Sequence, residues 1–222
     1  MKKVFIGICG IIGAGKTTLA ESLGKVLDLP VYKEEVIENS YLDDFYKDMP
    51  KFAFPLQIYL LNRRFRQQQQ IIWQGAGGIQ DRTIYEDSIF ARMLKDSGHM
   101  DERDYKTYID LFGNMSNFMK KPNVIVYLEV TPEESLIRIK ERSRNMESTI
   151  PLAYLQALAK AYEQFIKDIS KVIPVIRVDW NKFHSTEEMA AKIKEEYESI
   201  STIHSVQWPM QEAVFGTIWD FH

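Results

Sequence analysis

The segment Gly10-Ile11-Ile12-Gly13-Ala14-Gly15-Lys16-Thr17 places three glycines, a lysine and a threonine in the pattern G-x-x-x-x-G-K-[ST]. Glycines let backbone N–H groups approach a phosphate closely, and the start of a following helix adds partial positive charge. Lys16 would reach the β- and γ-phosphates, and the Thr17 hydroxyl would take a place on Mg²⁺. We therefore expect ATP and Mg²⁺ to be bound by Gly10, Gly13, Ala14, Gly15, Lys16, Thr17 and Thr18.

Apolar runs and helical patterns alternate around this motif. Residues 124–128 are continuously apolar, as expected for a strand that is covered on both faces. Such alternation predicts an α/β fold of the P-loop NTPase type, a five-stranded parallel sheet flanked by helices. The predicted strands are residues 4–9, 30–33, 78–80, 123–130 and 174–178, and the predicted helices include 52–73, 101–119, 132–144, 151–170 and 185–199.

The phosphate motif does not identify the acceptor of a transferred group. A GTPase would carry an Asn-Lys-x-Asp base-reading motif near the fifth strand, but residues 181–184 read Asn-Lys-Phe-His, which lowers that possibility. The four histidines are scattered, so no pairing with a nucleophile and no Cys/His metal cluster is indicated.

Composition limits the partners. The 222 residues carry a formal net charge of −3, which gives no field to attract nucleic acid or an anionic membrane. The sequence has no apolar run of 18 residues, so we expect no membrane span. Cys9 is the only cysteine, which fits a reducing cytoplasm. We expect one domain over residues 1–201 and a C-terminal extension over 202–222.

Further segments occur in a characteristic order and spacing. Tyr32-Lys33-Glu34-Glu35-Val36 ends the second predicted strand, residues 56–64 lie on the long predicted helix, and residues 80–87 follow the third strand. The arginine-rich stretch 138–144 precedes Glu147 and residues 150–154. With the phosphate motif, residues 3–200 resemble the deoxyribonucleoside kinases, especially bacterial-type deoxyadenosine/deoxycytidine kinases. The resemblance implies transfer of the ATP γ-phosphoryl group to the 5′-hydroxyl of a deoxynucleoside in nucleotide salvage.

The resemblance also assigns roles to the reacting end of a site. Glu34 matches the catalytic base, which accepts the proton of the 5′-hydroxyl. Asp81 would hold a water of the Mg²⁺ shell, and Arg82 would position the 5′ oxygen and neutralise developing charge. Lys16 completes the implied catalytic set.

At the nucleoside end, the resemblance implies base recognition by Gln57, Arg64 and Asp87, with Arg64 and Asp87 paired while they face the base. Phe90 would stack on the base. Tyr46 and Glu147 would hold the sugar 3′-hydroxyl, and Tyr46 would exclude ribonucleosides.

The arginine-rich stretch is the implied lid over the phosphates. Arg138 and Arg142 are four residues apart, so they share a helix face and could point together at phosphates. Arg144 could reach from another side. Asp179 and Phe183 lie on a segment that corresponds to the loop covering adenine in the family.

Two other functions remain open at this point. A thymidylate-type nucleoside-monophosphate kinase shares the fold, although a carboxylate at Glu34 would repel a phosphate acceptor. A nucleotide-binding regulator without transfer activity could keep Lys16 and Thr17. The resemblance further implies a homodimer formed by long helices. The ranking of deoxyadenosine, deoxycytidine and deoxyguanosine does not follow from the sequence.

Overall fold

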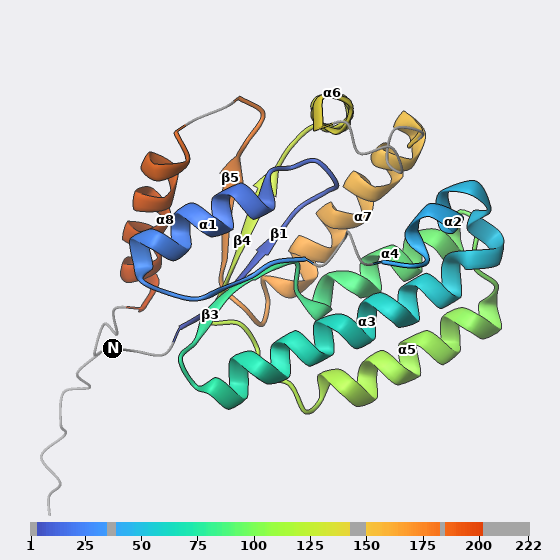
Figure 1. Cartoon of the computed structure of the whole chain (residues 1–222), viewed down its shortest axis with the longest axis horizontal. Helices are drawn as coiled ribbons and strands as arrows, with labels where there is room; N and C mark the ends of the chain where they lie inside the picture. Colours follow the sequence, from blue (N-terminus) through green and yellow to red (C-terminus); the bar gives the residue numbers. More distant parts are fainter. Residues whose placement is uncertain (1–3, 35–38, 143–149, 183–184, 202–222) are drawn as a thin grey trace, which may run out of the picture.

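A computed structural model describes residues 4–34, 39–142, 150–182 and 185–201. Its core is one parallel sheet in the order β2-β3-β1-β4-β5 (Figure 1). The strands are β1 (Phe5–Cys9), β2 (Val31–Tyr32), β3 (Gly78–Asp81), β4 (Val124–Glu129) and β5 (Val175–Asp179). The predicted five-stranded parallel sheet is confirmed.

The central strands are apolar because helices cover both faces of the sheet. All five residues of β1 are buried, and the first five residues of β4 are buried as well. β1 pairs with β3 on one side and with β4 on the other. Such a reversal of strand order opens a crevice at the carboxyl ends of the strands, where α/β proteins bind ligands.

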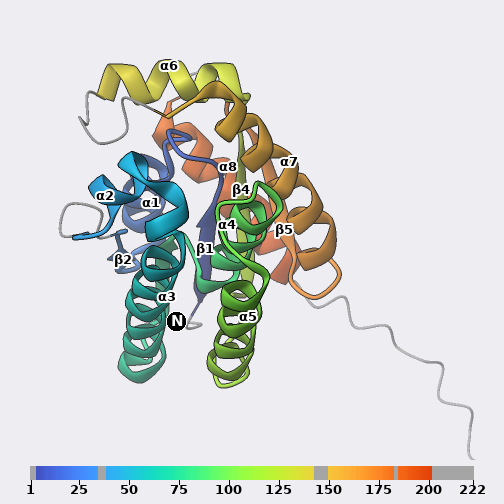
Figure 2. The same ribbon diagram turned by 90° about the vertical axis from the view of Figure 1, so that its right-hand side faces the viewer.

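Helices lie in layers on the two sides of the sheet (Figures 1 and 2). α1 and α8 pack together on one side, whereas α4 and α7 cover the other side, with α3 and α5 beside α4. No described helix is long and apolar enough to cross a membrane. The bounds are α1 (Lys16–Leu27), α2 (Leu42–Lys47), α3 (Met49–Gln74), α4 (Ile84–Asp96), α5 (Glu102–Ser116), α6 (Pro132–Arg142), α7 (Leu152–Ile169) and α8 (Thr186–Ser201).

Two of these helices, α2 and α4, were not predicted. α2 has only six residues, too few to show a helical period. α4 carries a start signal, because Glu86 follows Thr83 by three residues and its Oε1 accepts the Thr83 N–H at 3.0 Å. The long helix α3 begins at Met49, earlier than predicted, because the Asp48 side chain caps it by accepting the Lys51 N–H.

Candidate active site

A cavity of about 280 Å³ lies at the carboxyl ends of β1 and β3. It extends from the phosphate motif to the first half of α3, as far as Arg64. Most of the expected site residues line it, although they come from five separate parts of the chain. These residues are Gly13, Gly15, Lys16, Thr17, Glu34, Tyr46, Gln57, Arg64, Asp81, Arg82, Phe90 and Arg142.

The phosphate motif forms the loop between β1 and α1. Gly13 and Gly15 have φ angles of 77° and 84°, in the left-handed region that favours glycine. A Cβ atom at Gly13 would also lie 2.9 Å from the Ser135 carbonyl oxygen. The Lys16 ammonium donates to the carbonyl oxygens of Gly10 and Ile11 at 3.0 and 2.9 Å. Burial, followed by the nearby Arg82 charge, lowers the pKa of Lys16 to about 8.

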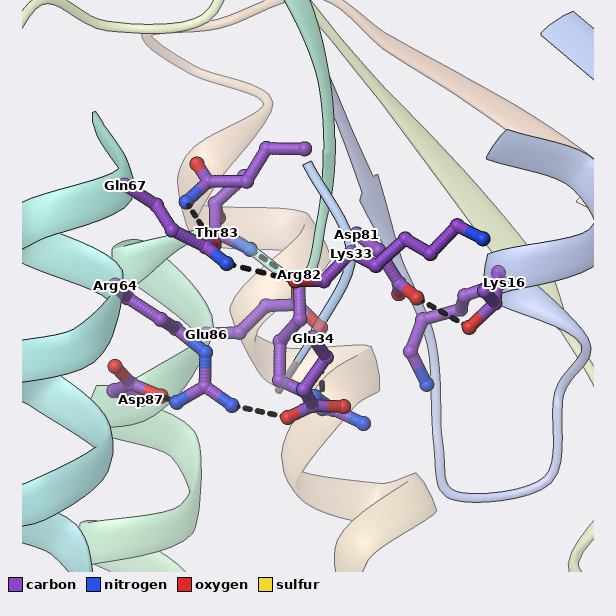
Figure 3. A network of polar contacts seen from close by, with 12 residues as sticks. Lys16, Lys33, Glu34, Arg64, Gln67, Asp81, Arg82, Thr83, Glu86 and Asp87 are labelled. Carbon is purple, nitrogen blue, oxygen red and sulfur yellow. Dashed lines mark hydrogen bonds and ion pairs between the residues drawn. The ribbon is translucent and has the colours of Figure 1, made fainter. Parts of the chain in front are cut away.

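The Glu34 carboxylate is held between two guanidinium groups (Figure 3). Its Oε1 accepts from Arg64 Nη2 at 2.5 Å and forms an ion pair with Arg82 Nε at 3.1 Å. Burial alone would raise the pKa of Glu34, but Arg82, Arg64 and Lys16 together lower it to about 2. The group is therefore ionised at neutral pH, as a proton acceptor must be.

Arg64 joins this carboxylate to a second one deeper in the molecule. Its Nη1 donates to Asp87 Oδ1, and both residues are buried (Figure 3). The side chain of Gln57 lies at the same end of the cavity and is 2% exposed. Its Oε1 has no hydrogen-bond partner among the described residues, so this oxygen can accept a hydrogen bond from a ligand.

Asp81 and Thr17 meet beside the phosphate loop. The Thr17 hydroxyl donates to Asp81 Oδ2, whereas Asp81 Oδ1 is buried with no partner in the described part of the chain. Burial raises the pKa of Asp81, although Lys16 acts in the opposite direction. A cation would stabilise the charged form. A hydroxyl, a carboxylate and bound phosphate are the oxygen ligands that Mg²⁺ uses in nucleotide sites, so these residues fit the ion.

Arg138 differs from the expectation. It does not point with Arg142 into the cavity: its Nη2 donates to the carbonyl oxygens of Trp180 and Asn181 at 2.6 and 3.2 Å. Its Nε donates to Glu134 at 2.8 Å. Arg138 and Arg142 share a helix face because they are four residues apart. The Arg138 guanidinium nevertheless binds the backbone carbonyl oxygens of Trp180 and Asn181 instead of facing the cavity.

Other expected residues lie outside the cavity lining. Gly10 and Ala14 are buried within the phosphate loop, Thr18 is exposed on α1, and Asp179 accepts from Asn181 at the end of β5. Asp87 lies behind Arg64. Arg144, Glu147 and Phe183 lie outside the described residues.

Several cavity neighbours were missed by the sequence analysis. Tyr154 of α7 lines the cavity, and Tyr162 lies two turns further along the same helix. The buried carboxyl of Glu86 contacts Arg82 and Tyr162. The α7 pattern gave one signal, since Tyr154, Leu158 and Tyr162 recur every four residues, but a core face has the same period.

A central strand followed by a G-x-x-x-x-G-K-T loop, with a carboxylate and an arginine facing that loop, defines a P-loop kinase. The family model for deoxynucleoside kinases matches residues 6–202. The chain belongs to this family and is a deoxynucleoside kinase.

Individual relatives agree with this assignment. A deoxyadenosine kinase of Dictyostelium discoideum is 60% identical over 204 residues, which cover 92% of this chain and 83% of the relative. The deoxyadenosine/deoxycytidine kinase of Bacillus subtilis (strain 168) is 41% identical over 180 residues, which cover 80% of this chain and 82% of the relative. A solved structure of M. mycoides deoxyadenosine kinase, with products dCMP and dCDP bound, has a TM-score of 0.80 at 34% identity, covering 88% of this chain and 100% of that one.

Proposed function

We propose that the enzyme transfers the γ-phosphoryl group of ATP to the 5′-hydroxyl of deoxyadenosine in nucleotide salvage, with deoxycytidine as a second acceptor and deoxyguanosine as a poorer one. The observation that carries the proposal is the position of Glu34, an ionised carboxylate between Arg82 and Arg64 in one cavity with the phosphate loop. The 60% identity to a deoxyadenosine kinase supports deoxyadenosine as the preferred acceptor, and the 41% identity to a deoxyadenosine/deoxycytidine kinase supports deoxycytidine as the second.

At the phosphate end, Lys16 and Arg142 bind the phosphates of ATP, and Arg82 stabilises negative charge on the transferring group. Glu34 accepts the proton of the 5′-hydroxyl. A pKa of about 2 makes Glu34 a weak base. Weak basicity is sufficient because the transition state of phosphoryl transfer is loose: little of the new bond has formed there, so the proton leaves late, after bond formation to phosphorus has made the hydroxyl oxygen acidic.

Mg²⁺ belongs to the same proposal. Thr17 and Asp81 would hold the ion, and the ion would neutralise charge that develops on the phosphate oxygens. The buried Asp81 Oδ1, which lacks a partner among the described residues, supports this assignment.

At the nucleoside end, Gln57 and the Arg64–Asp87 pair read the base, and Phe90 packs beside it. The Gln57 carboxamide oxygen is an acceptor, so it favours bases that present an amino group. Adenine and cytosine carry such a group where guanine and thymine carry a carbonyl oxygen. Tyr46 contacts the sugar.

We also propose a homodimer and a cytoplasmic location. Trp73, at the end of α3, and Phe118, just beyond α5, are 75% and 84% exposed. Exposed aromatic side chains of this size favour an interface with a second copy. The cytoplasmic location is supported only by the single buried Cys9, which needs no oxidising compartment.

The test is a parallel assay of ATP-dependent phosphorylation of all four deoxynucleosides, their monophosphates and adenosine. We expect the highest kcat/KM for deoxyadenosine and no turnover of monophosphates. Turnover of thymidine alone would contradict the assignment of Gln57, Arg64 and Asp87. Turnover of monophosphates alone would contradict the role of Glu34.

A further inference from the structure

Glu86 is a fully buried carboxylate that the proposed reaction does not use. It lies in the first turn of α4, behind Arg82 as seen from the cavity (Figure 3). Its Oε2 accepts from the Tyr162 hydroxyl at 2.6 Å and lies 3.4 Å from Gly10 N and 3.5 Å from Arg82 Nη1. Its Oε1 accepts from Thr83 N at 3.0 Å. All these partners are donors.

Arg82 needs such support. Its backbone has a φ of 69°, an unusual conformation for a residue with a side chain. Its guanidinium donates to the Tyr162 hydroxyl at 2.6 Å on one side and contacts Glu34 at 3.1 Å on the other. The ring of Phe90 lies 4.9 Å from it. Arg82 is thus held between one carboxylate in the cavity and another behind it.

We propose that Glu86 and Tyr162 are positioning residues that hold the Arg82 guanidinium in its reactive place and link it to the phosphate loop through Gly10. The proposal rests on the role of Arg82 in the proposed function. Without the negative charge of Glu86, attraction to Glu34 draws the Arg82 guanidinium toward the Glu34 carboxylate. The guanidinium and the Glu34 carboxylate then both lose their alignment with the 5′-oxygen.

Glu86→Gln tests the charge and the acceptor atoms of Glu86 at constant size, because the amide is as large as the carboxyl group but brings two N–H donors. In either orientation, its nitrogen faces a donor: Thr83 N–H on one side, or the Tyr162, Gly10 and Arg82 cluster on the other. We expect kcat to fall about 10- to 100-fold, because small misplacements of catalytic groups have effects of this size. The KM for deoxyadenosine and the Kd for ATP should change less than about threefold.

Tyr162→Phe provides a second test that does not depend on how well Glu86→Gln folds. It removes only the hydroxyl that joins Glu86 to Arg82 and keeps the ring that stacks on Tyr127. We expect kcat to fall about 3- to 10-fold, with Tm lowered by only about 2–8 °C. Tyr108→Phe, which also removes a buried tyrosine hydroxyl, is the matched control and should keep the wild-type kcat.

The double variant Glu86→Gln/Arg82→Lys decides whether Glu86 acts through Arg82. If it does, Glu86→Gln causes no further loss of kcat once Arg82 is replaced. Wild-type kcat in Tyr162→Phe, or additive losses in the double variant, would overturn the inference. If Arg82→Lys alone kept the wild-type kcat, the role of Arg82 in the proposed function would itself be wrong.

Discussion

One oxygen atom, Oε1 of Glu34, accepts a hydrogen bond from Arg64 and forms an ion pair with Arg82. Arg64 belongs to the part of the cavity where we place the base, and Arg82 to the part where we place the reacting phosphate. Because Glu34 contacts both, a nucleoside that displaces Arg64 also changes the charge around the carboxylate. This contact explains in physical terms how base recognition can affect the chemical step.

The first prediction concerns Glu34→Gln. The amide cannot accept a proton, so we expect phosphorylation of deoxyadenosine to fall by about 10²- to 10⁴-fold. Steady-state assays measure this loss, and calorimetry should show that ATP still binds. Glu21→Gln, which removes a partly exposed carboxylate that pairs with Lys33, is the control and should keep its activity. Unchanged turnover in Glu34→Gln would exclude Glu34 as the base.

The second prediction concerns the protonation of Lys16. With a pKa of about 8 in the free enzyme, the ammonium is largely deprotonated at pH 9, whereas bound phosphates favour the charged form. ATP binding should therefore take up protons between about pH 8 and 9 and weaken as the pH rises through this range. Calorimetry in two buffers of different ionisation enthalpy measures the uptake. Lys16→Arg stays charged and should bind without uptake. No uptake by the wild type at pH 8.5 would contradict the lowered pKa.

At the scale of elements, α6 is fastened to the phosphate loop at one end. The Ser135 hydroxyl donates to the Ile12 carbonyl oxygen at 2.5 Å, and Ile139 contacts Gly13. Arg138 binds the backbone after β5, and one turn later Arg142 lines the cavity. The helix thus carries one arginine that holds it in place and one that faces the site.

The third prediction separates these two arginines. Arg142→Ala should lower kcat by about 10- to 100-fold, because it removes a cation from the transferring phosphate. Arg138→Ala should instead raise the KM for ATP, with a smaller effect on kcat, because it loosens α6 and the backbone at Trp180. Steady-state kinetics with varied ATP distinguish the two patterns. Equal losses of kcat in the two variants, with an unchanged KM for ATP, would contradict these separate roles of Arg138 and Arg142.

The sequence is most informative where function depends on neighbours along the chain. The phosphate loop, β1 and the start of α1 are contiguous, so their pattern predicts both the fold class and the position of Lys16. Arg138 shows the opposite case, because helical spacing gives its face but not the backbone of Trp180 that binds it. Glu86 and Tyr162 are 76 residues apart, and their contact exists only in the folded chain.

At the scale of the whole molecule, the described surface carries unpaired aromatic side chains near one end of the α3–α5 layer. The fourth prediction is that the protein is a dimer with twice the mass of the 26.0 kDa chain, measured by light scattering after gel filtration. Trp73→Glu with Phe118→Glu should give the single-chain mass. Val172→Glu, which changes another exposed apolar residue, should leave the dimer intact. A wild-type protein of single-chain mass would contradict this prediction.

The strand order also has a kinetic consequence. β1 pairs Phe5 with Gly78 and Ile6 with Val124, so its two neighbours are synthesised long after it. Large loops must close before these pairs form, and such non-local pairing slows folding. Both sides of β1 are needed to seat the phosphate loop. During synthesis, the loop therefore remains without its complete support until β4 has left the ribosome, and the nascent chain reaches catalytic competence late.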